Sequence, residues 1–351
     1  LRNAVWLPSR IRIQGSGAES VITKINSQTL ELVADSDWYD QEITLSDDRG
    51  FQLGDGVCLR TKNPHNGSTE VLKRTLIARH GRRFKLDRAL RKNLWLSGKP
   101  TCSSLFPLFS GEHIRNVTIE GLTFDGNRQN HEHLDGNYGG CIWLQDCNRI
   151  HMRRLITHHN NGDGISWQIC HDVVVENCHS HDNADLGLHP GSGSQRPLIR
   201  NNRADRNNIG IFFCWGIKYG LAENNQITGN RSYGVSIGHC DTDNLIRLNT
   251  ITGSGKVGVL FRDDSRGKDF SPNRNTLEKN VIVDSGGGDG VAVDVQGRTR
   301  DVTLEGNQIR ETRKPMKRIG VRIGKQARDV KLQQNKIEGF QRDVVDLKEK
   351  P

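Results

Sequence analysis

The sequence has no run of about 18 consecutive apolar residues, so it contains no segment predicted to span a membrane. Apolar residues make up 34% of its 351 residues and aromatic residues 6%, which is too little for one large globular core. Eight cysteines do not make a disulfide scaffold at this length, and we expect buried free thiols because cysteine packs as a small hydrophobe. These shortages leave a thin core shared between stacked units, which is typical of a repeat protein.

The start of the chain and its charge bear on its location and partners. Leu1 stands where a start methionine would, and no signal peptide is visible, so we expect a secreted or periplasmic protein whose leader has been removed. The net charge of +9 points towards a polyanionic partner. The basic residues are dispersed and no nucleic-acid-binding module is present, so nucleic acid is an unlikely partner and an acidic polysaccharide is favoured.

Asparagine recurs at near-constant spacing within the phrase apolar-x-x-Asn-x-Ile. The intervals are 23, 24, 31, 27 and 28 residues, and Cys178 and Leu155 occupy the same place in two earlier units. An asparagine at a turn between short strands can bond the backbone of its own coil and of the next. Repeats of this length predict a solenoid. The asparagines are Asn202, Asn225, Asn249, Asn280, Asn307 and Asn335.

A second repeated phrase, glycine followed by alternating apolar residues, lies between the asparagines. Alternation of this kind predicts a short strand with one face in the core and one face outward. Coils that repeat such strands stack into parallel sheets with right-handed crossovers. The fold class is therefore all-β, a right-handed single-stranded parallel β-helix. The phrases begin at residues 164, 187, 210, 234, 258, 290 and 320.

The N-terminal third departs from this rhythm. We divide the chain into residues 1–110, with early coils and an inserted hairpin region, and residues 111–351, with the β-helix repeats and a C-terminal cap. A hairpin is expected to turn at His80-Gly81, within an excursion from the solenoid. A further insertion at 125–140 interrupts two coils, and insertions in solenoids often build the binding site.

Two phrases, IEGLTFDGN at 119 and DGISWQICHDVVVENC at 163, carry a family resemblance. With them the chain resembles the pectate-lyase-like superfamily of right-handed β-helices over residues 111–340. The resemblance implies the architecture and a carbohydrate-active protein, but no particular activity.

The outward positions of the glycine-led strands gather unusual side chains between about residues 140 and 265. We expect a catalytic centre around His189 and His239, with Asp185, Asp241, Lys218 and Arg262 beside them. Arginine would pair with a uronate carboxylate and a histidine or lysine would remove the C5 proton, giving β-elimination or C5 epimerisation. The expected substrate-binding residues are Trp143, Gln168, Phe212, Trp215, Asp243 and Asp263. Asp182 and Asp185 are candidates for an oxygen-rich Ca²⁺ site.

Two alternatives stay open. Asp185 paired with Asp241 or Asp243 would serve a glycoside hydrolase, in which two carboxylates flank the scissile bond. The phrases NNGDGIS and GVSIGH are similar to pieces of the polygalacturonase family, but Asp185-Leu186 stands where that family has adjacent aspartates. The second alternative is a β-helix that binds glycan without catalysis. The oligomeric state, the sugar and the linkage do not follow from the sequence.

Overall fold

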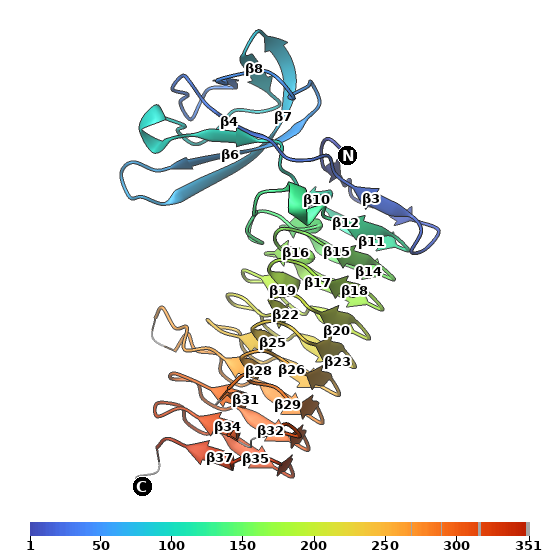
Figure 1. Cartoon of the computed structure of the whole chain (residues 1–351), viewed down its shortest axis with the longest axis vertical. Coiled ribbons are helices and arrows are strands. Elements are labelled where there is room, and N and C mark those ends of the chain that lie inside the picture. The colour runs from blue at the N-terminus through green and yellow to red at the C-terminus, as the bar shows by residue number, and fades with distance from the viewer. Residues whose placement is uncertain (268, 289, 315–316, 349–351) are drawn as a thin grey trace.

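The chain forms a long solenoid of three parallel sheets with a separate antiparallel sheet at its N-terminal end (Figure 1). The computed structural model describes residues 1–267, 269–288, 290–314 and 317–348. Each coil contributes one strand to each of three sheets, which we name sheets A, B and C. The parallel β-helix predicted from the two repeats is confirmed.

Strand order in every sheet of the solenoid follows the chain, because each coil pairs with the next one. Sheet A contains β1 (Val5–Trp6), β10 (Phe109–Glu112), β13 (Ile142–Gln145), β16 (Ile165–Gln168), β19 (Leu186–Gly191), β22 (Ile209–Phe212), β25 (Tyr233–Ile237), β28 (Val257–Phe261), β31 (Val291–Val295), β34 (Ile319–Ile323) and β37 (Arg342–Asp346). Sheet B contains β2 (Arg12–Gln14), β11 (Arg115–Glu120), β14 (Asn148–Arg153), β17 (His171–Glu176), β20 (Leu198–Arg200), β23 (Leu221–Glu223), β26 (Leu245–Arg247), β29 (Thr276–Glu278), β32 (Thr303–Glu305) and β35 (Lys331–Gln333). Sheet C contains β3 (Val21–Thr23), β12 (Thr123–Asp125), β15 (Ile156–His158), β18 (His179–His181), β21 (Arg203–Asp205), β24 (Gln226–Thr228), β27 (Thr250–Thr252), β30 (Val281–Val283), β33 (Gln308–Arg310) and β36 (Lys336–Glu338).

The recurring asparagines form a buried ladder at the corner between sheets B and C. Asn225 shows the pattern: its side-chain oxygen accepts from the backbone N–H of Asn202, and its amide donates to Asn249 Oδ1 and to the carbonyl of Ile199. Cys178 stands in the same place one coil before Asn202, and its backbone N–H donates to Asn202 Oδ1. The ladder satisfies buried polar groups of the tight corner, which an apolar residue would leave unpaired.

The glycine-led strand of each coil packs its first residue against sheet C. A side chain at Gly210 would meet Ile227 of β24 at 2.5 Å, so a glycine or another small residue is needed here. One expected register was wrong. Val293 pairs with Val259, so Ala292, and not Gly290, takes the place of Gly258. Asp294 therefore pairs with Leu260 on the outward face of sheet A.

A fourth sheet, sheet D, interrupts the solenoid between its first and second coils. It contains β4 (Thr29–Glu31), β9 (Thr101–Ser103), β6 (Gly56–Lys62), β7 (Thr69–His80), β8 (Arg83–Leu86) and β5 (Glu42–Thr44), with the short 3₁₀ helix η1 (Leu96–Gly98) before β9. Strands β7 and β8 form the hairpin expected at His80-Gly81. Sheet D has its own apolar core and docks onto sheet A, where Lys73 lies over the ring of Trp143.

The inserted segment at 125–140 and the end of the chain complete the fold. A second 3₁₀ helix, η2 (Arg128–Asn130), lies within the insertion. In the expected C-terminal cap, β37 continues sheet A, and residues 349–351 lie outside the described part of the chain. Among the described residues no helix is long and apolar enough to cross a membrane.

Candidate functional site

His189 lies on the outward face of sheet A, as predicted, but it is buried. It pairs in register with Ser166 of β16, and only 3% of its surface is exposed. Its Nδ1 lies 2.7 Å from Oδ2 of Asp163, which is also buried. The expected exposure was wrong because the insertion covers this part of the sheet.

The insertion is fixed over His189 by several polar contacts. Ser166 Oγ donates to the carbonyl of Gly136 at 2.6 Å, and a Cβ at Gly136 would collide with the Asp163 carboxylate. His133, three residues earlier, places Nε2 2.5 Å from Oδ2 of Asp185. Asp185 therefore anchors the insertion, where the sequence had predicted a catalytic carboxylate.

The electrostatics of the His189–Asp163 pair favour a protonated imidazole. Burial opposes the charge on His189, but the charge of Asp163 and the hydrogen bond to it raise the pKa of His189 to about 10. Burial also raises the pKa of Asp163. His189 Nε2 is buried and has no hydrogen-bond partner among the residues that the structure describes. It is thus the ring atom available for proton exchange with a bound molecule.

Arg262 reaches back towards His189 along sheet A. Its Nη1 donates to Ser236 Oγ at 2.8 Å, its Nη2 donates to the carbonyl of Phe213 at 3.0 Å, and its guanidinium lies 4.3 Å from the centre of the Phe212 ring. The Phe212 ring also contacts His189, with ring centres 5.5 Å apart. Phe212 therefore touches both cationic side chains.

His239 belongs to a different group of side chains. Its ring lies between Trp215 and Phe270, at centre distances of 4.9 and 5.2 Å, and its Nδ1 accepts from the backbone N–H of Arg266. Trp215 is 40% exposed. The two histidines predicted as one centre thus lie two coils apart, His189 in β19 and His239 after the end of β25.

The other predicted carboxylates are engaged elsewhere. Asp241 is buried and accepts from the backbone N–H groups of Gly216, Ile217 and Gly238, and burial raises its pKa to about 6. Asp243 holds Arg274 with two hydrogen bonds of 2.7 and 2.8 Å. The geometry therefore leaves neither aspartate free as the partner of Asp185 that a hydrolase would need.

Several residues that the sequence predicted to act on or bind the substrate also lie apart from His189. Lys218 forms backbone bridges at the corner towards sheet B, and its charge acts on nearby Asp243. Asp263 faces Gly297 in the following coil. Trp143 is 2% exposed because sheet D covers it with Lys73. Of the predicted substrate-binding residues, the structure brings Gln168 and Phe212 close to His189.

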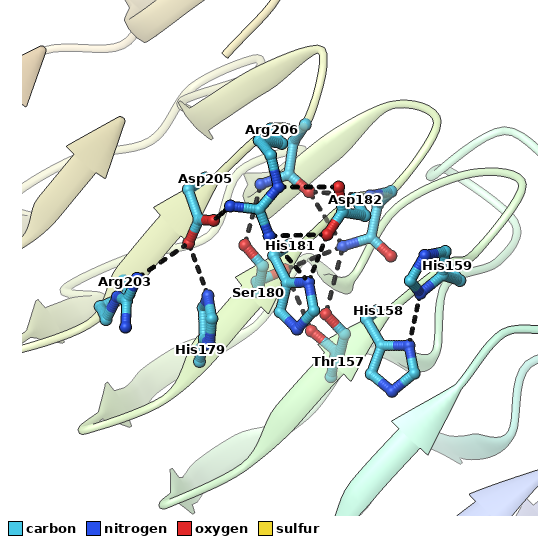
Figure 2. Close-up of polar contacts among 12 residues, drawn as sticks. Thr157, His158, His159, His179, Ser180, His181, Asp182, Arg203, Asp205 and Arg206 are labelled. Carbon is cyan, nitrogen blue, oxygen red and sulfur yellow. Dashed lines mark hydrogen bonds and ion pairs between the residues drawn. The ribbon is translucent and has the colours of Figure 1, made fainter. Parts of the chain in front are cut away.

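Asp182 lies in a separate polar cluster on sheet C (Figure 2). Four histidines gather there: His158 and His181 stack with ring centres 5.2 Å apart, His179 lies tilted against His181 at 4.2 Å, and His159 meets His158 edge-on at 4.9 Å. Arg206 holds Asp182 through two hydrogen bonds and lowers its pKa. Asp182 and Asp185 thus have different partners, Arg206 and His133. Within residues 1–267, 269–288, 290–314 and 317–348, no group of three or more His, Cys, Asp or Glu side chains is arranged to hold a metal ion.

Sequence reasoning missed three members of the site. Asp163 and Ser166 stand in the phrase GDGIS, and Cys214 is the last residue of GIFFC, in an outward column with Gln168, Gly191, Gly238 and Arg262. Its neighbours in that column, Gly191 and Gly238, provide space for larger side chains, as described below. A carboxylate immediately before a glycine-led strand was the available signal for Asp163.

Comparison with known proteins agrees with this architecture. The family model described as the right-handed β-helix region matches residues 109–275. No curated protein matches the sequence. The A-module of mannuronan C-5 epimerase AlgE4 from Azotobacter vinelandii is similar in structure, with a TM-score of 0.60 and 15% identity over 98% of this chain and 83% of that one. PfbA, a surface adhesin of Streptococcus pneumoniae, gives a TM-score of 0.50 and 12% identity over 70% and 74% of the two chains. The fold is a right-handed parallel β-helix of the pectate-lyase-like type.

Proposed function

We propose that the protein is a carbohydrate-active enzyme that acts on an acidic polysaccharide by β-elimination or C5 epimerisation at the His189 site of sheet A. The observation that carries the proposal is the buried Nε2 of His189, which lacks a hydrogen-bond partner in the described part of the chain. A buried polar atom without a partner is costly unless a ligand completes it. Asp163 fixes the ring so that Nε2 is the atom that meets the ligand.

Charge supports an anionic substrate. Arg262 and protonated His189 flank Phe212, so a uronate carboxylate near them would have its charge neutralised. Neutralisation of that carboxylate stabilises the carbanion that forms when the C5 proton leaves. The net charge of the protein, +9, is also positive and favours an anionic substrate. A mannuronan C-5 epimerase of the same fold shows that a β-helix can carry this type of chemistry.

The test is turnover of a panel of uronate-containing and neutral polysaccharides, followed by ultraviolet absorbance, reducing ends and the configuration at C5. We expect unsaturated products or C5 inversion from uronates only. His189→Gln should lower the rate by about 10²–10⁴-fold, because a proton-transfer group is lost while the amide still donates to Asp163. Alanine is less suitable, since a buried carboxylate left unpaired costs about 3–5 kcal/mol.

The matched control is His80→Gln, on the exposed hairpin turn of sheet D. It should leave both activity and melting unchanged. Full activity of His189→Gln, or reducing ends without unsaturation, would contradict the proposal.

A glycan-binding protein without catalysis is the second candidate. It is favoured by the exposed Trp215, which stacks against His239 and lies under the guanidinium of Arg266. Exposed aromatic faces bind sugar rings, and an adhesin has the same fold. Binding of a polysaccharide that is lost in Trp215→Ala, with no turnover of any member of the panel, would support this candidate.

A further inference from the structure

Cys214 occupies the middle of an outward row on sheet A that contains two glycines. In coil order the row is Gln168, Gly191, Cys214, Gly238 and Arg262. Gln168 pairs with Gly191, and Gly191 forms a bridge with Cys214. The thiol is partly exposed, whereas six of the other seven cysteines are buried.

The glycines allow the long side chains at both ends of the row to lie towards the sulfur. A Cβ on Gly191 would overlap the amide of Gln168, and a Cβ on Gly238 would overlap the guanidinium of Arg262. Each long side chain therefore lies across a glycine, on the side of Cys214. Larger residues at Gly191 or Gly238 would prevent this arrangement.

Two buried polar atoms next to Cys214 have no partner within the described ranges, namely His189 Nε2 and Gln168 Oε1. Both side chains are 97% buried, since each exposes 3% of its surface. Cys214 lies on the coil that follows His189, two residues after Phe212, whose ring contacts the imidazole. A thiol, an imidazole with an unpaired nitrogen and an unpaired amide oxygen thus meet at one place on sheet A.

We propose that Cys214 is the base of the reaction and His189 the acid, and that the substrate is a uronate whose H5 and O4 lie on the same face of the ring. This inference rests on the proposed function. The thiolate is the form of a cysteine that accepts a proton, and the guanidinium of Arg262 lies across Gly238 on the side of Cys214.

The proton balance needs no other reactant. The Cys214 thiolate takes the C5 proton and becomes a thiol, and the electron pair left on C5 spreads into the carboxylate near Arg262. The C4–O4 bond then breaks as the C4=C5 double bond forms, and O4 takes the proton of His189 Nε2. Transfer of the proton from the Cys214 thiol to the His189 imidazole restores the starting state of the enzyme. The polysaccharide is therefore cleaved without water.

The placement of acid and base selects the stereochemistry. Both side chains project from the outward face of one sheet, on coils about 4.8 Å apart, so a sugar lying against that face meets both from the same side. Removal of H5 and protonation of O4 from one side is a syn elimination. D-Mannuronate and D-glucuronate have H5 and O4 on the same ring face, whereas L-guluronate and D-galacturonate have them on opposite faces. Epimerisation would need a proton donor on the other side of the sugar, so elimination is the favoured outcome.

The experiment compares two pairs of polymers, polymannuronate with polyguluronate and glucuronan with polygalacturonate, by the absorbance of unsaturated products. We expect product from polymannuronate or glucuronan and none from their partners. Cys214→Ser should lower the rate by about 10²–10⁴-fold without a change in melting. Cys240→Ser, at the other partly exposed cysteine, should have no effect.

A second readout does not depend on turnover. Iodoacetamide should alkylate Cys214 faster than Cys240, and His189→Gln should slow the reaction at Cys214 alone, as followed by mass spectrometry. Three outcomes would overturn this inference while leaving the proposed function in place. They are equal alkylation of the two cysteines, a rate of Cys214→Ser within tenfold of the native one, and product from guluronate or galacturonate. No unsaturated product from any of the four polymers would overturn the elimination itself.

Discussion

The asparagine ladder makes a quantitative prediction about stability. Asn249, in the middle of the ladder, is 1% exposed and makes four side-chain hydrogen bonds. Its Oδ1 accepts from the backbone and side chain of Asn225, and its Nδ2 donates to the carbonyl of Ala222 and to Asn280 Oδ1. Asn249→Ala removes all four and leaves the buried N–H of Asn225 without its acceptor.

The expected loss follows from these four bonds. At about 1 kcal/mol for each buried hydrogen bond, Asn249→Ala should lower the free energy of unfolding by about 4 kcal/mol. An unfolding entropy of about 2.1 cal/mol/K per residue gives about 0.7 kcal/mol/K for a chain of this length, so the melting temperature should fall by about 5–6 °C if the solenoid melts as one unit. Differential scanning calorimetry measures the fall. Hydrogen exchange should show lost protection at the amide of Asn225.

The control is Asn335→Ala, at the last position of the same ladder. Asn335 accepts from Asn307 and donates to Leu304, but it is only partly buried, so water can replace its partners. Its loss should lower the melting temperature by clearly less than that of Asn249. Equal effects of the two substitutions, or a fall of less than 2 °C for Asn249→Ala, would refute the role assigned to the buried ladder.

Two shorter predictions concern pH and metal ions. Burial lowers the pKa of His131 to about 4, and its Nε2 lies 2.6 Å from the carbonyl of Ile25. The unfolded chain therefore binds more protons than the folded one between pH 6.5 and 4, so stability should fall as the pH falls through this range. The melting temperature measured against pH should show this fall, and the fall should be less steep in His131→Gln. EDTA should leave activity unchanged because Asp182 and Asp185 are engaged by Arg206 and His133; loss of activity that Ca²⁺ restores would contradict this.

The repeated part of the fold could be predicted because every coil has the same environment. An asparagine at the same corner meets the same backbone groups, so its spacing was sufficient to predict the ladder and the equivalent place of Cys178. Where the repeat was irregular the prediction failed. Gly290 was assigned to the strand start because a glycine had stood there in earlier coils, whereas Ala292, which is also small, takes that place.

The site was predicted in part, for a physical reason. Alternation along a strand fixes which side of the sheet a residue faces, so His189, Phe212 and Arg262 were correctly placed on the outward face. It does not fix what lies above that face. Sheet D covers Trp143, and the insertion at 125–140 covers His189. Neither segment repeats along the chain, so its position depends on single contacts such as that of Ser166 with Gly136.

Burial by these non-repeating segments also changes the chemistry expected of the outward residues. An exposed histidine would titrate near pH 6.5 and serve as a base. Covered by the insertion and bonded to Asp163, His189 has its pKa raised to about 10, and for this reason the proposed reaction uses it as the acid and takes the base from another residue. In the same way, the sequence did not show that the glycines on either side of Cys214 allow Gln168 and Arg262 to lie towards the thiol. The repeats therefore place the strands, and the departures from the repeat determine what surrounds each outward side chain.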